Sequence, residues 1–493
     1  MTAFSLETAQ LAWCAELRAL ADERLRPLAE KGEPGRVNRA LLVELGALGL
    51  LPRLFTSGAL DLCLMRESLA HACTEAETAL ALQGLGAHPV HAHGTETQRA
   101  RWLPRVSDGS AVAAFALSEP DAGSDAAALS LGAEPDAGPA DVGAAGTGGA
   151  HAGGADARGA HAGGADAGRR GAPGTTRPVT PGTTTAGRPG TGTARPGAGR
   201  GAEASRPPGP GTPDTGRPGP EPSRPAPDAH GPGARQAPAP ASLAADRDGP
   251  SAWRLTGEKC WISNAPEADF YTVFARTTPG AGARGVTAFL VPADRPGLTG
   301  TPLDMLSPHP IGALAFDAVP VTTDDVLGEA DRGFRVAMDT LNLFRPSVGA
   351  FAVGMAQAAL DATLAHTTAR TAFGGRLRDL QTVAHQTAEM ALRTEAARLM
   401  VYAAATAYDE GAPDVPRRSA MAKLLATETA QYVVDRAVQL HGARALRRGH
   451  LLEHLYREVR APRVYEGASE VQRGIIAKEL YRTLDATTEE AGA

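Results

Sequence analysis

Apolar residues return at helical spacing in the first and the last parts of the chain. Residues 1 to about 110 contain runs such as "LETAQLAWCAELRALADERL" and "NRALLVELGALGLL", in which leucine and alanine recur every three or four positions. From Gly333 onward, long alanine-rich amphipathic runs cover 333–368, 378–410 and 418–441. Both parts are therefore predicted to be helical, the second as a bundle.

Between the helical parts, runs of β-branched and aromatic residues bounded by Gly and Pro predict strands. These runs read "AVAAFALSE", "WRLTGEKCWISN", "FYTVFART" and "GVTAFLVPA", and the later segment "LSPHPIGALAF" is interpreted as a loop. The order of the elements predicts an α+β fold with segregated layers. Its expected parts are an N-terminal helical domain at 1–112, a middle β-barrel-like domain at 113–332, a C-terminal four-helix bundle at 333–485 and a tail at 486–493.

The predicted β-domain is interrupted by a segment of different composition. Residues 135 to 242 hold two large aliphatic residues, Val142 and Val179, and are otherwise rich in Gly, Ala, Pro, Thr and Arg. Such a segment cannot bury enough apolar surface to offset its loss of backbone entropy. We therefore expect a disordered insertion at 131–248, whose flanks remain able to pair as strands. The histidines of its repeated "GAHAGGADA" lack a rigid frame and other ligand residues, so no metal site is expected.

Charge and cysteine usage narrow the possible functions. The net charge is −6 and the pI is about 6.1, which favours neither nucleic-acid nor anionic-membrane binding. The four cysteines are scattered without metal-binding spacing, as is typical of reduced thiols. The amino terminus has no long uncharged apolar run, and no transmembrane segment is apparent, so we expect a cytoplasmic protein.

The stretch "RVYEGASEVQR" contains a carboxylate that the local pattern does not require. Ser469 and Gln472 have the spacing of a capping box, which predicts a helix that begins near Glu470. Glu466 then lies in the preceding turn. From the local pattern it could equally be a solvated carboxylate that the helix dipole favours.

The stretch "FALSEPDAGSD", residues 115–125, indicates a turn after a strand. Its density of hydroxyl groups exceeds what a turn needs. Ser118 and Ser124, with neighbouring amides, could line an anionic or heteroaromatic ligand.

Together these motifs resemble the acyl-CoA dehydrogenase family. "ALSEPDAGSD" is similar to the family's first signature and "YREVRAPRVYEGASEVQR" to its second. Between them, in the family's order, stand "GEKCWISNA", "GVTAFLVPADRPGLTG", "GFRVAM", "FRPSVGAFAVGMAQAALD", "ARTAFGGRLRDLQ" and "VQLHG", and "GTETQRARWLP" precedes them. The resemblance covers nearly all of the chain outside the insertion.

The resemblance implies a flavoenzyme that binds FAD between the β-domain and the bundle, usually as a homotetramer or dimer. It implies oxidation of an acyl-CoA or acyl-carrier-protein thioester to the trans-2-enoyl thioester, with an electron-transfer flavoprotein or a similar acceptor. The α-proton of a thioester is weakly acidic, so a base must be tuned upward by burial and the developing enolate must be stabilised. Glu466, in "YEG", corresponds to the family's catalytic base.

The remaining site residues are also assigned by resemblance. The expected flavin and adenosine contacts are Phe115, Leu117, Ser118, Ser124, Trp261, Ser263, Gln439, Gly442, Ala468 and Glu470, with Arg370, Phe373 and Gln381 contributed by a neighbouring subunit. The expected substrate contacts are Ser124, Asn342, Arg345, Tyr465 and Gly467. Without the family, Trp261 could be a core aromatic residue and Arg370 an exposed arginine at a helix end.

The chain departs from the family pattern at several positions. Ala443 and Ala445 replace glycines, Ala468 and Ala372 replace threonines, and Asn342 replaces an aspartate. Each change could weaken FAD binding by about 1 kcal/mol per lost hydrogen bond. Two alternatives therefore stay open: an oxygen-using flavin relative such as an acyl-CoA oxidase, and a catalytically silent scaffold that binds an acyl carrier.

Overall fold

The computed structural model describes residues 6–136 and 252–491. The expected disorder of residues 137–251 lies outside the described residues. The predicted start of the insertion at residue 131 is wrong, because Gly132–Pro135 forms strand β2, antiparallel to β3 (Ala252–Ser263). Pairing with β3 and burial of Ala133 outweigh the low strand propensity of this segment. The insertion therefore connects two adjacent strands of one sheet.

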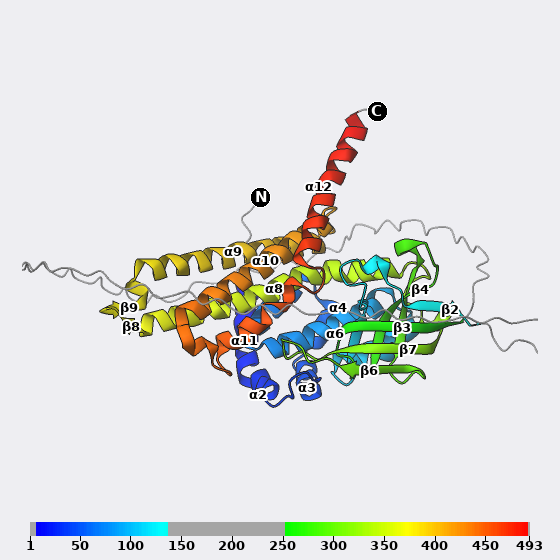
Figure 1. The fold of residues 1–493 in the computed structure, drawn as a ribbon, viewed down its shortest axis with the longest axis horizontal. Helices are drawn as coiled ribbons and strands as arrows, with labels where there is room; N and C mark the ends of the chain where they lie inside the picture. Colours follow the sequence, from blue (N-terminus) through cyan, green and yellow to red (C-terminus); the bar gives the residue numbers. More distant parts are fainter. Residues whose placement is uncertain (1–5, 137–251, 492–493) are drawn as a thin grey trace, which may run out of the picture. The chain divides into compact units, whose positions relative to one another are not determined.

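The N-terminal part is helical, as predicted (Figure 1). Its helices are α1 (Thr8–Leu20), α2 (Arg26–Ala29), α3 (Arg39–Ala47), α4 (Leu50–Thr56), α5 (Ala59–Ala72), α6 (Thr74–His93) and α7 (Glu96–Ser107). Helix α6 is joined to the sheet by the buried Gln83, whose side chain donates to the carbonyl of Ala111 and accepts from the amide of Ala113, both at 2.7 Å. These two bonds fix the position of the first strand, which leads into the "LSE" segment.

The middle part is one curled seven-stranded sheet. Besides β2 and β3, its strands are β1 (Ala113–Ala116), β4 (Phe270–Arg276), β5 (Val286–Pro292), β6 (Leu298–Pro302) and β7 (Ile311–Thr322). The strand order is β1-β4-β2-β3-β7-β6, with β5 on β4, and β1 and β4 are parallel.

One segment of the sheet was interpreted wrongly from the sequence. The loop "LSPHPIGALAF" becomes strand β7 from Ile311, paired with β3 on one side and β6 on the other. Leu314, Phe316, Val319 and Val321 are its buried residues. A Pro and a Gly at the start of this run hide the alternation, but two neighbouring ladders stabilise it.

The C-terminal part is helical over nearly the predicted ranges. Its elements are α8 (Gly333–Ala369), the hairpin β8 (Thr371–Ala372) and β9 (Gly375–Arg376), α9 (Gln381–Asp409), α10 (Val415–His441), α11 (Leu451–Glu458) and α12 (Ser469–Ala491). Helices α8, α9 and α10 pack against one another, α12 packs on α10, and α5 of the N-terminal part packs on α8 and α9.

Helix α8 passes through Pro346 without ending. Proline has no N–H to donate to the carbonyl of Asn342 one turn earlier. That carbonyl instead accepts a hydrogen bond of 3.2 Å from Oγ of Ser419 on α10. Among the described helices, α8 alone is long and apolar enough to cross a membrane, yet 72% of its most apolar window is buried in the structure, which is typical of a core helix.

Candidate active site

Glu466 lies in a tight turn between two helical segments. It has a φ of 51°, in the left-handed region that non-glycine residues seldom adopt, and Gly467 follows with a φ of 94°. Arg345 of α8 donates from Nε to the Glu466 carbonyl at 3.3 Å, and Lys423 of α10 donates from Nζ to the Gly467 carbonyl at 2.7 Å. Two buried cations from two helices therefore hold the unusual backbone in place.

The capping-box interpretation of this segment is wrong, although the helix starts within one residue of the predicted position. Ser469 is the first residue of α12, and its Oγ donates to Glu428 Oε1 at 2.6 Å. The buried Gln472 donates from Nε2 to the carbonyls of Glu466 and Gly467, at 3.1 and 2.9 Å. A Cβ on Gly467 would lie 2.5 Å from this Nε2, and the φ of 94° is strained for any other residue, so the turn favours glycine there. Both side chains thus stabilise the turn and the helix packing instead of capping each other.

The carboxyl group of Glu466 is buried on one side and unpaired. Its Oε2 is inaccessible to solvent and has no hydrogen-bond partner within the structure. Burial raises the pKa of Glu466 above its usual value, and the positive charges of Arg66, Lys423 and Arg345 partly oppose this rise. The alternative of a solvated surface carboxylate is therefore wrong, and the group is suited to accept a proton.

Sequence reasoning missed a buried polar group beside this turn. Arg66 of α5 donates from Nε to Glu77 of α6 and from Nη1 to Oγ of Ser347 on α8, the latter at 2.7 Å. Arg66 is 3% exposed, Glu77 1% and Ser347 0%. The charged pair Arg66 and Glu67, which follows the apolar run "LCLM" and precedes further apolar residues, was the available signal. A buried arginine requires partners, and here they come from two other helices.

Lys423 was also missed, because it is one lysine in an alanine-rich helix. Burial lowers its pKa to about 8, while the nearby Glu466 carboxyl opposes this decrease. Its ammonium group therefore loses its charge more readily than that of an ordinary lysine. Lys423 combines two roles: it holds the Gly467 carbonyl and supplies positive charge near the Glu466 carboxyl.

Trp261 marks a second part of the site, on the sheet. The pairing of β3 with β7 shifts register between Lys259 and Ile262, so Trp261 lies in a bulge with a φ of 57°. Its side chain is 47% exposed. The indole of Trp261 is therefore accessible to a ligand, and the alternative of a core aromatic residue does not fit this exposure. Ser263 lies two residues further along the same strand.

A buried ion pair holds the first signature motif beside Trp261. Lys259 donates from Nζ to the carbonyl of Leu117 at 2.9 Å and to Glu119 Oε1 at 2.8 Å. The amide of Cys260 donates to the carbonyl of Ser118 at 3.0 Å. Leu117 and Ser118 are thereby held next to the Lys259–Trp261 segment, and sequence reasoning missed both Lys259 and Glu119. Breaking a buried pair of this kind typically costs about 3–5 kcal/mol.

Two further predicted residues lie on the sheet side of the molecule. The ring of Phe115 on β1 packs against Phe274 on β4, with centroids 4.9 Å apart. Ser124 is exposed in the loop after the signature. Phe115 therefore belongs mainly to the sheet packing, while Ser124 is accessible to a ligand.

The other predicted residues near the Glu466 turn differ from one another in exposure and in hydrogen bonding. Asn342 accepts from Nη1 of Arg345 at 3.3 Å, and Tyr465 is about one-third exposed. Ala468 is partly buried. Glu470 is exposed and pairs with Arg473 at 3.4 Å, so its carboxylate is directed to the surface.

The remaining predicted cofactor residues lie at the end of the bundle that carries β8 and β9 (Figure 1). The rings of His366 on α8 and His441 on α10 stack there, with centroids 4.1 Å apart. The residues predicted to contact the cofactor at this end are all exposed: Arg370, Phe373, Gln381, Gln439 and Gly442. Phe373 is 89% exposed, with a φ of 52°. From Arg345 to Arg370 the axis of α8 runs about 37 Å, at about 1.5 Å per residue. The structure therefore does not bring this group together with Glu466 within one chain.

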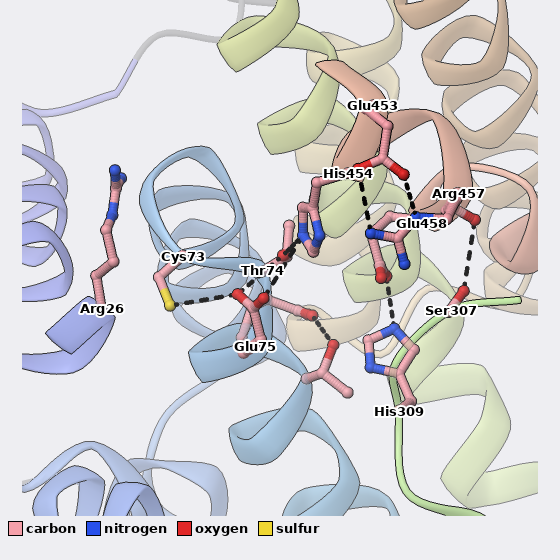
Figure 2. Close-up of polar contacts among 12 residues, drawn as sticks. Arg26, Cys73, Thr74, Glu75, Ser307, His309, Glu453, His454, Arg457 and Glu458 are labelled. Atoms are coloured by element: carbon pink, nitrogen blue, oxygen red, sulfur yellow. Dashed lines mark hydrogen bonds and ion pairs between the residues drawn. The ribbon is translucent and has the colours of Figure 1, made fainter. Parts of the chain in front are cut away.

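A cavity of about 440 Å³ lies on another face of α6, and the residues that line it do not include Glu466. His309 and His454 form part of its wall. Figure 2 shows both side chains with their polar partners. His309 bonds the buried Glu458 at 2.6 Å, and His454 bonds Oγ1 of Thr74 at 2.6 Å. These side chains have partners inside the protein, so the cavity is not the centre of the candidate chemistry.

Three family models match consecutive parts of the sequence. They describe the acyl-CoA dehydrogenase N-terminal domain at residues 7–110, the middle domain at 232–319 and the C-terminal domain at 331–481. The chain belongs to the acyl-CoA dehydrogenase family. The predicted α+β fold, with helical, sheet and helical parts in this order, is thereby confirmed.

Individual acyl-CoA dehydrogenases are similar over part of their length. A probable acyl-CoA dehydrogenase of Mycobacterium tuberculosis is 39% identical over 233 residues, 47% of this chain and 60% of that protein. The short-chain specific mitochondrial enzyme of Homo sapiens is 39% identical over 246 residues, 49% of this chain and 59% of that protein. The aligned regions thus span about three-fifths of these relatives.

Solved structures share the fold over nearly the whole chain. Butyryl-CoA dehydrogenase from Megasphaera elsdenii has a TM-score of 0.70 at 24% identity, covering 97% of this chain and 99% of that one. A structure of PigA with FAD and proline has a TM-score of 0.69 at 22% identity, covering 97% and 98%.

Proposed function

We propose that this protein is an FAD-dependent dehydrogenase that oxidises the Cα–Cβ bond of an acyl thioester to the trans-2-enoyl thioester. The observation that carries the proposal is Oε2 of the Glu466 carboxyl, which is buried and without a partner, on a turn that α8 and α10 hold in place. Family membership supplies the class of reaction. Glu466 is the proposed base that removes the α-proton.

The residues present fit a flavin. The exposed indole of Trp261 offers a flat apolar surface, and the partly exposed Ser118 on the adjacent segment offers a hydroxyl group beside it. Leu117, Ser118, Trp261 and Ser263 would hold the ring system, with Phe115, Ser124, Ala468 and Glu470 as further contacts. FAD, when bound, supplies the acceptor for the hydride that leaves the β-carbon.

The surroundings of Glu466 perform two tasks. Burial raises the pKa of the carboxyl, which strengthens it as a base, while Arg66, Arg345 and Lys423 supply positive charge that keeps it ionised before proton transfer. The thioester is proposed to lie next to the Glu466 carboxylate. Asn342, Arg345, Tyr465 and Ser124 are the other proposed substrate contacts.

We further infer that a second copy of the chain completes the cofactor site. The exposed group of Arg370, Phe373, Gln381, Gln439 and Gly442 is about 37 Å along α8 from the Glu466 turn, by the rise of an α-helix. A neighbouring subunit can bring this group to the dinucleotide. An electron-transfer flavoprotein or a similar protein is the proposed electron acceptor.

The visible spectrum of the purified protein tests the proposal. A yellow protein that is bleached anaerobically by an acyl-CoA, and slowly reoxidised by air, supports the dehydrogenase. Rapid reoxidation by oxygen indicates an oxidase-like relative instead. A colourless protein that stays apo when FAD is added indicates the silent scaffold.

A further inference from the structure

A chain of hydrogen bonds connects a buried ion pair to the peptide group between Leu117 and Ser118. Glu119 is 2% exposed and Lys259 is 0% exposed. Nζ of Lys259 donates to Oε1 of Glu119 at 2.8 Å and to the carbonyl oxygen of Leu117 at 2.9 Å. That carbonyl and the N–H of Ser118 belong to one planar peptide group, in which electrons are delocalised. The ammonium group of Lys259 is therefore bonded directly to the peptide group that carries the Ser118 N–H.

The Ser118 N–H points away from this ion pair and is available to a ligand. The Leu117–Ser118 peptide bond is trans, so its N–H is directed opposite to the carbonyl that Lys259 contacts. Ser118 is partly exposed, and within the described part of the chain neither its N–H nor its hydroxyl group has an acceptor. Its carbonyl accepts from the amide of Cys260 at 3.0 Å. Two unused donors therefore lie on the segment next to Trp261, whose indole is uncovered.

The carboxylate of Glu119 does not depend on Lys259 alone for its hydrogen bonds. Its Oε2 accepts from the amide and the hydroxyl group of Ser130, at 2.6 and 2.8 Å, and its Oε1 accepts from the amide of Leu131 at 2.9 Å. Burial lowers the pKa of Lys259 to about 8, and the Glu119 carboxylate opposes this decrease, so the ammonium group keeps its charge at neutral pH. The charge of Lys259 can therefore be removed without leaving Glu119 unbonded.

We propose that Lys259 is a positioning residue that strengthens the Ser118 N–H as a donor to the flavin and thereby favours reduced over oxidised FAD. This inference rests on the proposed function, in which Ser118 contacts the flavin. Hydrogen bonds in series polarise one another, and a positive charge at the Leu117 carbonyl draws electrons away from the N–H. Reduction adds electrons to the flavin ring, so a stronger donor stabilises the reduced form more than the oxidised form. Lys259 thus raises the reduction potential of bound FAD.

The test is the reduction potential of FAD bound to the protein, measured without oxygen against a reference dye, with dithionite as the reductant. The double variant Lys259→Met/Glu119→Gln removes both charges together and nearly preserves the volume. Its binding of reduced FAD, relative to oxidised FAD, should weaken about tenfold, which corresponds to a potential about 30 mV lower. Lys259→Met alone should lower the potential further, because the negative charge of Glu119 then has no ammonium partner while its bonds to Ser130 and Leu131 remain.

The matched control is an ion pair between two helices. Glu67 of α5, which is 3% exposed, accepts from Nε of Arg398 of α9 at 2.8 Å. The double variant Glu67→Gln/Arg398→Met makes the same kinds of change as the Lys259 double variant. It should lower the free energy of unfolding and leave the potential of bound FAD unchanged. A loss of stability alone therefore does not explain a lower potential.

Several results would overturn the inference. An unchanged potential in the FAD-bound Lys259 variants would contradict it, as would an equal decrease in the Glu67→Gln/Arg398→Met protein. A smaller decrease in Lys259→Met than in the double variant would also contradict it, because the charge of Glu119 requires the opposite order. A protein that binds no FAD would overturn both this inference and the proposed function. The potential is measured without a thioester, so the expected decrease in a protein that no acyl-CoA reduces would support the role of Lys259 and contradict the dehydrogenase function alone.

Discussion

The Glu466 turn and the hairpin end of the bundle are both predicted to serve one cofactor site, yet they are built differently. At the turn, Arg345, Lys423 and Gln472 satisfy two backbone carbonyls, and the side chains involved are buried. At the hairpin end, Arg370 and Phe373 are exposed. The difference is consistent with the proposal that one chain forms the Glu466 turn by itself and that a second copy completes the dinucleotide contacts.

The largest expected effect comes from the turn. Glu466→Gln removes the base and keeps the shape, so turnover of an acyl-CoA should fall by about 10³-fold or more, with FAD still bound. Steady-state assays and the visible spectrum check both results. Glu395→Gln, on the exposed side of α9, is the control and should change turnover less than about twofold. Retained activity in Glu466→Gln would remove this residue as the base.

The second largest effect is expected at the hairpin end of the bundle. Arg370→Ala should weaken FAD binding by about 10- to 150-fold, because a charge-assisted hydrogen bond contributes about 1.5–3 kcal/mol. Isothermal titration of apoprotein with FAD measures this, with Arg376→Ala on β9 as the exposed control.

A mixed oligomer separates the contribution of a second copy from a local effect. Protein assembled from Glu466→Gln chains and Arg370→Ala chains contains some sites with both residues unchanged, provided that each site uses two copies. Such mixed oligomers should bind FAD and oxidise an acyl-CoA faster than oligomers of either variant alone. Activity equal to the average of the two variants would mean that Arg370 acts within its own chain.

A smaller effect concerns the pH dependence of the turn. The pKa of Glu466 is raised by burial, so turnover should fall as pH decreases through that raised pKa and the base becomes protonated. Lys423→Met removes a positive charge that lowers this pKa, so the acidic limb of the kcat profile should move to higher pH. Lys478→Met, on the exposed face of α12, should leave the profile in place. If the acidic limb does not move in the Lys423→Met variant, Lys423 does not influence the pKa of the proposed base.

The smallest effect is expected when the threonine hydroxyl that is usual in the family is restored beside the Glu466 turn. Ala468→Thr should strengthen FAD binding by about 1 kcal/mol, or roughly fivefold, if the lost threonine contacted the cofactor. The same titration measures it. No change in affinity would place Ala468 outside the cofactor site.

Much of the fold could be predicted from the local pattern of apolar and polar residues along the sequence. Helices α8, α9, α10 and α12 lie close to their predicted ranges because amphipathic periodicity persists over many turns. Strand β7 was missed, because Pro310 and Gly312 resemble loop residues until two neighbouring ladders are known. The capping box at Ser469 and Gln472 was wrong because Ser469 bonds Glu428 on α10, while Gln472 bonds the carbonyls of the Glu466 turn.

The sequence by itself determined the helical and sheet parts, the family and the identity of the candidate base, since each rests on short-range periodicity or on contiguous motifs. Only the tertiary structure showed that Oε2 of Glu466 is buried and unpaired, and that Arg66, Lys423 and the Lys259–Glu119 pair surround the two halves of the site. These charged residues come from helices and strands far apart in the chain. Their burial and partners depend on packing, which spacing along the sequence does not encode.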